Sequence, residues 1–220
     1  DQQFDADATV VKKLRDAGAI LVAKLSLGEL AMGDVWFGGT TRTPWDTSKG
    51  SSGSSAGSAS AVAACLLPFA IGTETYGSIT SPCTACGTTG LRPTFGRVSR
   101  AGAMALSWTM DKIGPITRSI DDASIVFSAI CGPDPEDRTT SNAGFHWDAT
   151  SGIKGLKIGF DSGAFKRADK SQQAVLDFFK SQGAELIPVT IPASEPAFAA
   201  LPDIIIGAEG AAAFSDLISD

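Results

Sequence analysis

Residues 48–81 read SKGSSGSSAGSASAVAACLLPFAIGTETYGSITS, and this stretch decides the fold. Between Ser48 and Ser60 every residue except Lys49 is Ser, Gly or Ala, a composition that is also typical of a flexible linker. The run leads directly into the apolar, helix-prone stretch 59–67, however, and linkers do not usually continue into a buried helix. Small residues ahead of such a helix indicate close backbone packing or a tight turn. We therefore interpret the run as an ordered turn.

A second turn of small and polar residues follows the helix. Residues 68–72 predict a strand, and residues 72–81 predict the turn that ends it. A serine in a tight, glycine-flanked turn can act as a nucleophile, and neighbouring N–H groups can stabilise an oxyanion. Glycine-rich turns also bind phosphate, but neither turn matches G-x-G-x-x-G or the P-loop pattern. The single histidine, His146, lies far along the chain in a polar loop, so a Ser–Lys arrangement is favoured over Ser–His–Asp.

The remaining elements alternate between helix and strand. Apolar residues at helical spacing predict helices, and short apolar runs predict strands. This alternation indicates an α/β fold with parallel pairing in part. The expected helices are 8–17, 120–131, 171–182 and 204–218, and the expected strands are 19–23, 156–160 and 185–191.

The charge balance excludes two classes of partner. Of the 220 residues, 18 are Lys or Arg and 24 are Asp or Glu, which gives a net charge of −6. Direct nucleic-acid binding needs a basic surface, and an anionic membrane needs a polybasic patch. No apolar run approaches the roughly 20 residues of a membrane span, and the polar, acidic start is no signal peptide. We expect no nucleic-acid contact and no membrane segment in this chain.

The four cysteines are Cys65, Cys83, Cys86 and Cys131. The pair Cys83-x-x-Cys86 could form half of a zinc site or a redox pair. A zinc site needs two further ligands at short spacing, and the sequence has one histidine. We expect small buried thiols, no metal, and a reducing compartment, with the cytoplasm favoured.

The whole pattern resembles the amidase signature family. The motif runs from Gly53 through Ser78 and continues in residues 86–87, 90–94, 96–100 and 111–115. The resemblance covers nearly the whole chain and is strongest over residues 24–115, which would be the signature core. It implies an α/β fold with a mixed, largely parallel central sheet covered by helices on both faces. Residues 1–220 would then be the central part of a single domain, incomplete at both ends.

The resemblance implies a Ser–cis-Ser–Lys triad that cleaves carboxylic amides through an acyl-enzyme. On the motif, the nucleophile falls on Ser78 and the bridging serine on Ser54, with a cis peptide bond between Gly53 and Ser54. No metal or organic cofactor is required. The oxyanion hole would use the N–H groups of Thr75, Tyr76, Gly77 and Ser78, and substrate would contact Ser52, Gly53 and Tyr76. Tyr76 stands where family members have Gly, so its ring should narrow or line the acyl pocket.

The lysine is the main departure from the pattern. The family places its Lys upstream of the helix that here begins near Asp7, so we expect the base outside this chain and the isolated chain to be inactive. Lys24 is an alternative base, but it matches a different lysine of the family. The favoured function is hydrolysis of a small-molecule amide, with a homodimer possible. There are two alternatives. One is the glutamine-hydrolysing A subunit of a tRNA-dependent amidotransferase, and the other is a non-catalytic fragment or scaffold of the same fold. Tyr76, and Thr80 where Arg is common, favour the general amidase.

Overall fold

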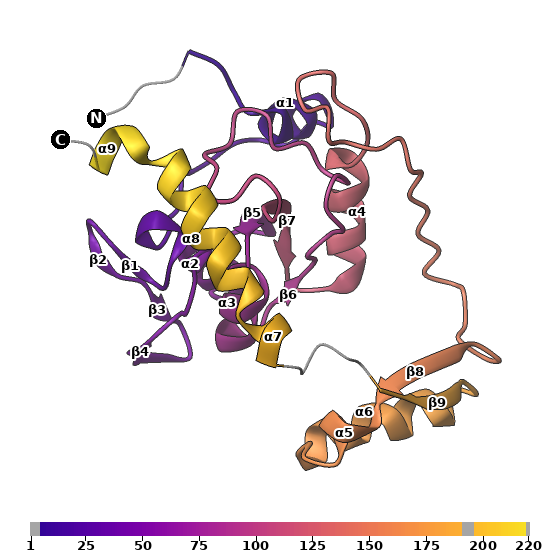
Figure 1. Ribbon diagram of the computed structural model, residues 1–220. Coiled ribbons are helices and arrows are strands. Elements are labelled where there is room, and N and C mark those ends of the chain that lie inside the picture. Colours follow the sequence, from indigo (N-terminus) through magenta and orange to yellow (C-terminus); the bar gives the residue numbers. More distant parts are fainter. Residues whose placement is uncertain (1–4, 191–195, 219–220) are drawn as a thin grey trace. The chain divides into compact units, whose positions relative to one another are not determined.

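The computed structural model describes residues 5–190 and 196–218, which belong to two compact units (Figure 1). The larger unit contains the chain up to Trp147 together with the residues from Asp203 onward. The smaller unit is the stretch between them, Asp148–Pro202.

The centre of the larger unit is a three-stranded sheet with the order β5-β7-β6. Strand β5 (Phe69–Glu74) pairs antiparallel with β7 (Lys112–Thr117), which also pairs antiparallel with β6 (Thr89–Gly90). Helix α2 (Ala56–Ala63) packs on this sheet beside α3 (Thr80–Cys86). Its small side chains allow a close approach to the sheet, where Ser58 Oγ donates to the carbonyl of Ile71 at 2.8 Å.

Helix α1 (Thr9–Asp16) lies beside helix α4 (Ile120–Ile130) (Figure 1), and an apolar cluster joins them to β7. Ser119 caps α4 by accepting a hydrogen bond from the amide of Asp122 at 3.1 Å. Lys13 of α1 donates to the carbonyl of Cys131, just after α4, at 3.0 Å. The buried side chains of this cluster are Val10, Val98, Ile113, Phe127 and Ile130.

A turn, two hairpins and the last described helices, from Asp203 onward, complete the larger unit. The turn η1 (Glu29–Ala31) precedes two hairpins, each a two-stranded antiparallel sheet. Helix α8 (Leu201–Ala213) and helix α9 (Ser215–Ile218) close the described chain. The hairpin strands are β1 (Val35–Trp36) with β2 (Gly39–Thr40), and β3 (Arg42–Thr43) with β4 (Asp46–Gly50).

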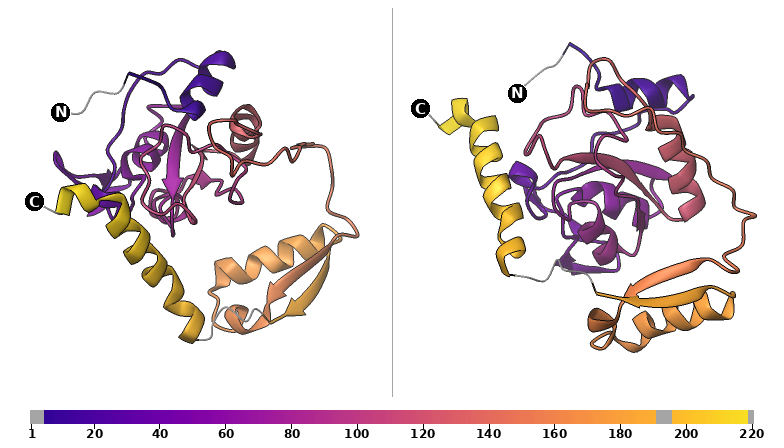
Figure 2. Two further views of the ribbon diagram at one scale, coloured as in Figure 1. Left: turned by 45° about the horizontal axis from the view of Figure 1, so that its top comes forward. Right: turned by 45° about the vertical axis from the view of Figure 1, so that its right-hand side comes forward.

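The smaller unit pairs strand β8 (Lys157–Asp161) with β9 (Glu185–Val189) in parallel (Figure 2). Helix α6 (Lys170–Ser181) connects the two strands, and a capping box of Asp169 and Gln172 fixes its start. The short helices α5 (Ser162–Phe165) and α7 (Pro196–Ala199) also belong to this unit.

The mixed α/β architecture is confirmed, but the sheet differs from the expectation. Parallel pairing occurs between β8 and β9, whereas the β5-β7-β6 sheet is antiparallel, so a largely parallel central sheet is not found in the described part of the chain. The expected strand 19–23 does not form, because these residues have no partner strand among the described residues, and a strand needs one for its N–H and C=O groups. The last residue of the expected strand 185–191 lies outside the described residues.

Two of the four cysteines are buried, as expected, and two are not. Cys83 and Cys86 are buried, and burial raises the pKa of both thiols, whereas Cys65 is exposed and Cys131 half-buried. Cys65 lies just beyond α2, in a turn where it adopts φ 59°. Within the described ranges, none of the helices is long and apolar enough to cross a membrane.

Candidate active site

The second serine turn is closed by a buried carboxylate. Glu74 is the last residue of β5, and its side chain is 3% exposed. Its Oε2 accepts hydrogen bonds from the amides of Ile79 at 2.7 Å and Thr80 at 2.9 Å. The four residues between them, 75–78, therefore form a loop whose two ends are joined by one side chain.

Two further side chains hold this loop from β7 and the residue before it. Thr75 Oγ1 donates to Asp111 Oδ1 at 2.6 Å, and Lys112 Nζ donates to the carbonyl of Thr75 at 3.3 Å. Burial lowers the pKa of Lys112, and the nearby Arg92 charge lowers it further. Gly77 adopts φ +104°, a conformation that favours glycine. The loop is thus fixed without using its own amides.

The amides of this loop are unpaired. Among the described residues, the N–H groups of Thr75, Tyr76, Gly77 and Ser78 donate no hydrogen bond, whereas the next two amides are bound by Glu74. Successive free N–H groups on a rigid backbone can stabilise an anion that develops during a reaction. The arrangement can therefore receive the oxygen of a tetrahedral intermediate.

The first serine turn is packed backbone to backbone. A Cβ on Gly53 would lie 1.8 Å from the carbonyl oxygen of Gly33, so no larger residue fits there. The Gly53–Ser54 peptide bond is cis, as the resemblance implies. The amide of Ser55 donates to the carbonyl of Ser78 at 3.1 Å, which joins the two turns directly.

Two adjacent buried serines differ in their hydrogen bonds. Ser55 Oγ accepts from the amide of Thr73 at 3.0 Å and donates to the carbonyl of Thr73 at 3.1 Å. Ser54 Oγ is fully buried, yet it has no hydrogen-bond partner in the described part of the chain. A hydrogen bond between the hydroxyls of Ser54 and Ser78 is therefore absent. An unpaired buried hydroxyl is costly, so it marks a place where another polar group is expected.

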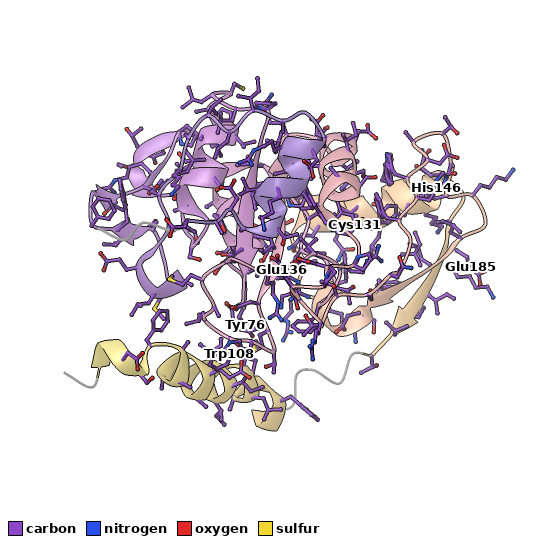
Figure 3. All side chains as sticks on the ribbon, turned by 90° about the horizontal axis from the view of Figure 1, so that it is seen from above. Tyr76, Trp108, Cys131, Glu136, His146 and Glu185 are labelled. Carbon is purple, nitrogen blue, oxygen red and sulfur yellow. The ribbon has the colours of Figure 1, made fainter. Side chains whose placement is uncertain are left out.

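Both turns border a cavity of about 520 Å³. Gly53, Thr75, Tyr76 and Ser78 line one side of it, and helix α8 lines another. Tyr76 is 65% exposed and, with Trp108, lies on the side of the larger unit that faces α8 (Figure 3). Two of the three residues expected to contact substrate, Gly53 and Tyr76, line this cavity. Ser52 is not among the residues that line it, and its hydroxyl is hydrogen-bonded to Ser81 Oγ at 2.7 Å.

The two alternative bases lie elsewhere. Lys24 is exposed, in the irregular segment before η1. His146 is exposed and lies far from Tyr76 in Figure 3. The sequence did not reveal two features of the site. One is the pair of hydrogen bonds by which Glu74 closes the loop, and the other is the side of the cavity that α8 forms, called the wall below. The wall could have been found from the spacing of small and apolar residues along 203–214.

Known proteins are similar to this chain in sequence and in structure. The sequence profile of the amidase family matches residues 2–219. The A subunit of glutamyl-tRNA(Gln) amidotransferase from Lysinibacillus sphaericus is 41% identical over 205 residues, which are 88% of this chain and 42% of that protein. The solved structure of the corresponding Thermotoga maritima protein has 35% identity and a TM-score of 0.84, over 94% of this chain and 48% of that one. Native peptide amidase from Stenotrophomonas maltophilia has 34% identity and a TM-score of 0.81, over 96% of this chain and 47% of that one. The chain spans less than half the length of these relatives.

Proposed function

The chain belongs to the amidase family, and from that premise we propose that it carries the nucleophile and the oxyanion site of an amide hydrolase. Ser78 is the nucleophile, Ser54 relays its proton, and the amides of residues 75–78 hold the oxyanion. Residues 24–115 form the catalytic core of a single domain, because both turns and most of their supports lie within them.

One observation carries this proposal. The fully buried hydroxyl of Ser54 lacks a hydrogen-bond partner among the described residues. The turn that contains Ser78 lies next to it, because the amide of Ser55 donates to the carbonyl of Ser78. A structural serine would be paired, as Ser55 is. A serine that relays a proton must instead be open to a donor and an acceptor during the reaction.

The chemistry follows from these groups. A neutral amine from outside the described residues, a lysine on the family pattern, takes the proton of Ser54, which takes the proton of Ser78. Ser78 Oγ attacks the carbonyl carbon of the substrate amide. The carbonyl oxygen then develops negative charge, which the free amides of residues 75–78 stabilise. The C–N bond breaks as the proton returns through Ser54 to the leaving nitrogen. Water then cleaves the ester, which releases the acid and restores Ser78.

A second candidate function is the release of ammonia from glutamine. It is favoured by the 41% identity to a protein named as the A subunit of glutamyl-tRNA(Gln) amidotransferase. The same serine would be acylated, and the leaving group would be ammonia. The two candidates differ in substrate and share the nucleophile.

The test uses the protein expressed from its complete gene. Release of nitroaniline from acyl anilides and of ammonia from glutamine is measured for the wild type and for Ser78→Ala. Ser78→Ala should abolish both activities and the mass increase caused by a fluorophosphonate. Ser128→Ala, an exposed serine on α4, is the matched control and should change neither.

The outcomes separate the candidates. Anilide hydrolysis that depends on Ser78 supports the general amidase, and hydrolysis of glutamine alone supports the second function. A fluorophosphonate adduct on a different serine would overturn the assignment of the nucleophile. A wild type that shows neither activity nor an adduct would support a non-catalytic scaffold.

A further inference from the structure

We propose that one face of α8 selects an uncharged, apolar substituent on the amide substrate, and that Gly207 sets the length that fits. This inference rests on the proposed function, because it describes the substrate of the same site. The substrate class is an amide of an aliphatic or aromatic group that carries no charge near the scissile bond.

The wall is one stripe of a helix. Its lining residues recur three or four positions apart, which places them on a single face of α8. All of them except one are apolar or glycine, and they face the cavity that Tyr76 and Ser78 line from the other side. The stripe consists of Asp203, Ile206, Gly207, Gly210 and Ala211, and Phe214, the residue after the helix, continues the lining.

A carboxylate outside this stripe holds the helix in place. Glu209 accepts hydrogen bonds from Ser107 Oγ, from Thr109 Oγ1 at 2.8 Å and from the amide of Thr109 at 3.2 Å. Ser107 is fully buried, so its hydroxyl depends on this partner. The first of these hydrogen bonds contributes to a lowered pKa of Glu209. The wall is therefore fixed to the loop that contains Ser107.

The same loop is fixed to the oxyanion turn. Asp111 Oδ2 accepts from the amides of Leu106 at 2.8 Å and Ser107 at 3.0 Å, while its Oδ1 accepts from Thr75 Oγ1. One continuous set of hydrogen bonds thus connects Glu209 on α8 to Thr75 beside the reacting position. Because both ends are held by the same loop, the distance from the wall to the nucleophile is set by the fold.

The lining chemistry excludes an anionic substituent and favours an apolar one. Leu30, Met32 and Leu106 also line the cavity, and the charged side chain among its described lining residues is the carboxylate of Asp203, with no Lys, Arg or His beside it. A free amino acid such as glutamine carries an α-carboxylate, which would enter this cavity without a cation to pair with. An apolar group instead gains about 25 cal/mol for each Å² removed from water.

Gly207 is the position where the wall can be changed without strain. Gly207 lines the cavity, and a Cβ built on it meets no heavy atom within 4 Å, so a larger side chain can be placed at this point of the lining. Gly210, one turn further on, is different, because its Cβ would lie 3.3 Å from Leu106 Cδ1. Of the two glycines, Gly207 therefore controls the free length of the cavity.

The experiment compares acyl nitroanilides of increasing chain length in the protein expressed from its complete gene. Gly207→Leu should lower the ratio of kcat/KM for the octanoyl to the acetyl substrate by about tenfold or more, because a filled cavity rejects the longer group. Gly144→Leu, a change at another glycine with open space around its Cβ, is the control and should leave the ratio as it is. An unchanged ratio in Gly207→Leu, or glutamine turned over faster than the octanoyl substrate, would overturn the inference.

A binding measurement separates this inference from the proposed function. In the Ser78→Ala background, calorimetry with octanoyl anilide should show a Kd at least about tenfold weaker when Gly207→Leu is added. That result supports the wall even if the wild type hydrolyses no anilide. An equal Kd with and without Gly207→Leu overturns it even if the wild type is an active amidase.

Discussion

In two stretches of the larger unit, burial is the opposite of what their compositions suggest. Residues 51–58 are serine, glycine and alanine, yet Ser51, Ser54 and Ser55 are fully buried. Residues 19–23 are apolar, yet Ile20 is 84% exposed and Val22 65% exposed. Burial in this chain therefore follows how closely backbones approach and where their polar groups find partners, and hydrophobicity alone does not decide it.

The physical reason lies in the size of the side chains. Glycines and small residues let the first turn contact neighbouring backbone directly, as when the amide of Gly57 donates to the carbonyl of Ser26 at 2.9 Å. The apolar stretch has no strand beside it in the described residues, so its backbone and its side chains both face outward.

The largest expected effect is at Gly57. A Cβ on Gly57 would lie 2.6 Å from the amide nitrogen and 2.9 Å from the carbonyl oxygen of Ser26, so the backbone itself would have to move. Gly57→Ala should therefore lower the free energy of unfolding by about 3 kcal/mol. The measurement is urea unfolding of the protein expressed from its complete gene. Gly144→Ala, where the Cβ meets open space, should change it by less than about 0.5 kcal/mol, and equal effects would contradict close packing of the turn.

The next effect separates two neighbouring serines. Ser55→Ala leaves the amide and the carbonyl of Thr73 without their hydroxyl partner and should cost about 2 kcal/mol of unfolding free energy. Ser54→Ala removes a buried hydroxyl that has no described partner, so it should leave the free energy of unfolding unchanged or raise it by up to about 1 kcal/mol, while abolishing amide hydrolysis. Unfolding curves and an anilide assay measure both. A large loss of stability in Ser54→Ala would show that its hydroxyl is structural.

These two serines also show what the sequence could predict. The motif identified both turns, the cis bond between Gly53 and Ser54, and the helix and strand between them, because these depend on residues close together along the chain. It did not predict that β5 pairs antiparallel with β7, or that α8 borders the cavity, because those contacts join residues far apart. The strand expected at 19–23 failed for a related reason: a strand needs a partner, which local composition does not provide.

A smaller effect depends on pH and concerns the helix before the apolar stretch. Hydrogen bonds from Ser99 at 2.5 Å and Thr9 at 2.6 Å hold the pKa of Asp134 below its usual range. A carboxyl whose pKa is lower in the folded state stabilises the fold above the unfolded pKa, and this contribution is lost as the pH falls through the folded value. Asp134→Asn should lower the unfolding free energy by about 1 kcal/mol at pH 7, and by less below about pH 4. A difference between the two proteins that stays constant from about pH 7 to about pH 3 would contradict this.

The smallest effect is at the exposed apolar stretch. In residues 1–220, replacing Ile20 and Val22 with Thr should change the unfolding free energy by less than about 0.5 kcal/mol, because neither side chain is buried there. The double substitution should raise the concentration at which the chain stays monomeric, measured by light scattering. A loss of several kcal/mol would mean that this stretch is buried after all, and the comparison with residues 51–58 would fail.

The free amides of residues 75–78 have a consequence for the end of the reaction. On the proposed function, a row of N–H groups that attracts a short-lived oxyanion also attracts a stable carboxylate, and hydrolysis of the amide would leave one in that place. The acid product should therefore compete with the substrate for the same amides. Turnover should slow as the product accumulates, and the inhibition should weaken at a pH low enough to protonate the acid.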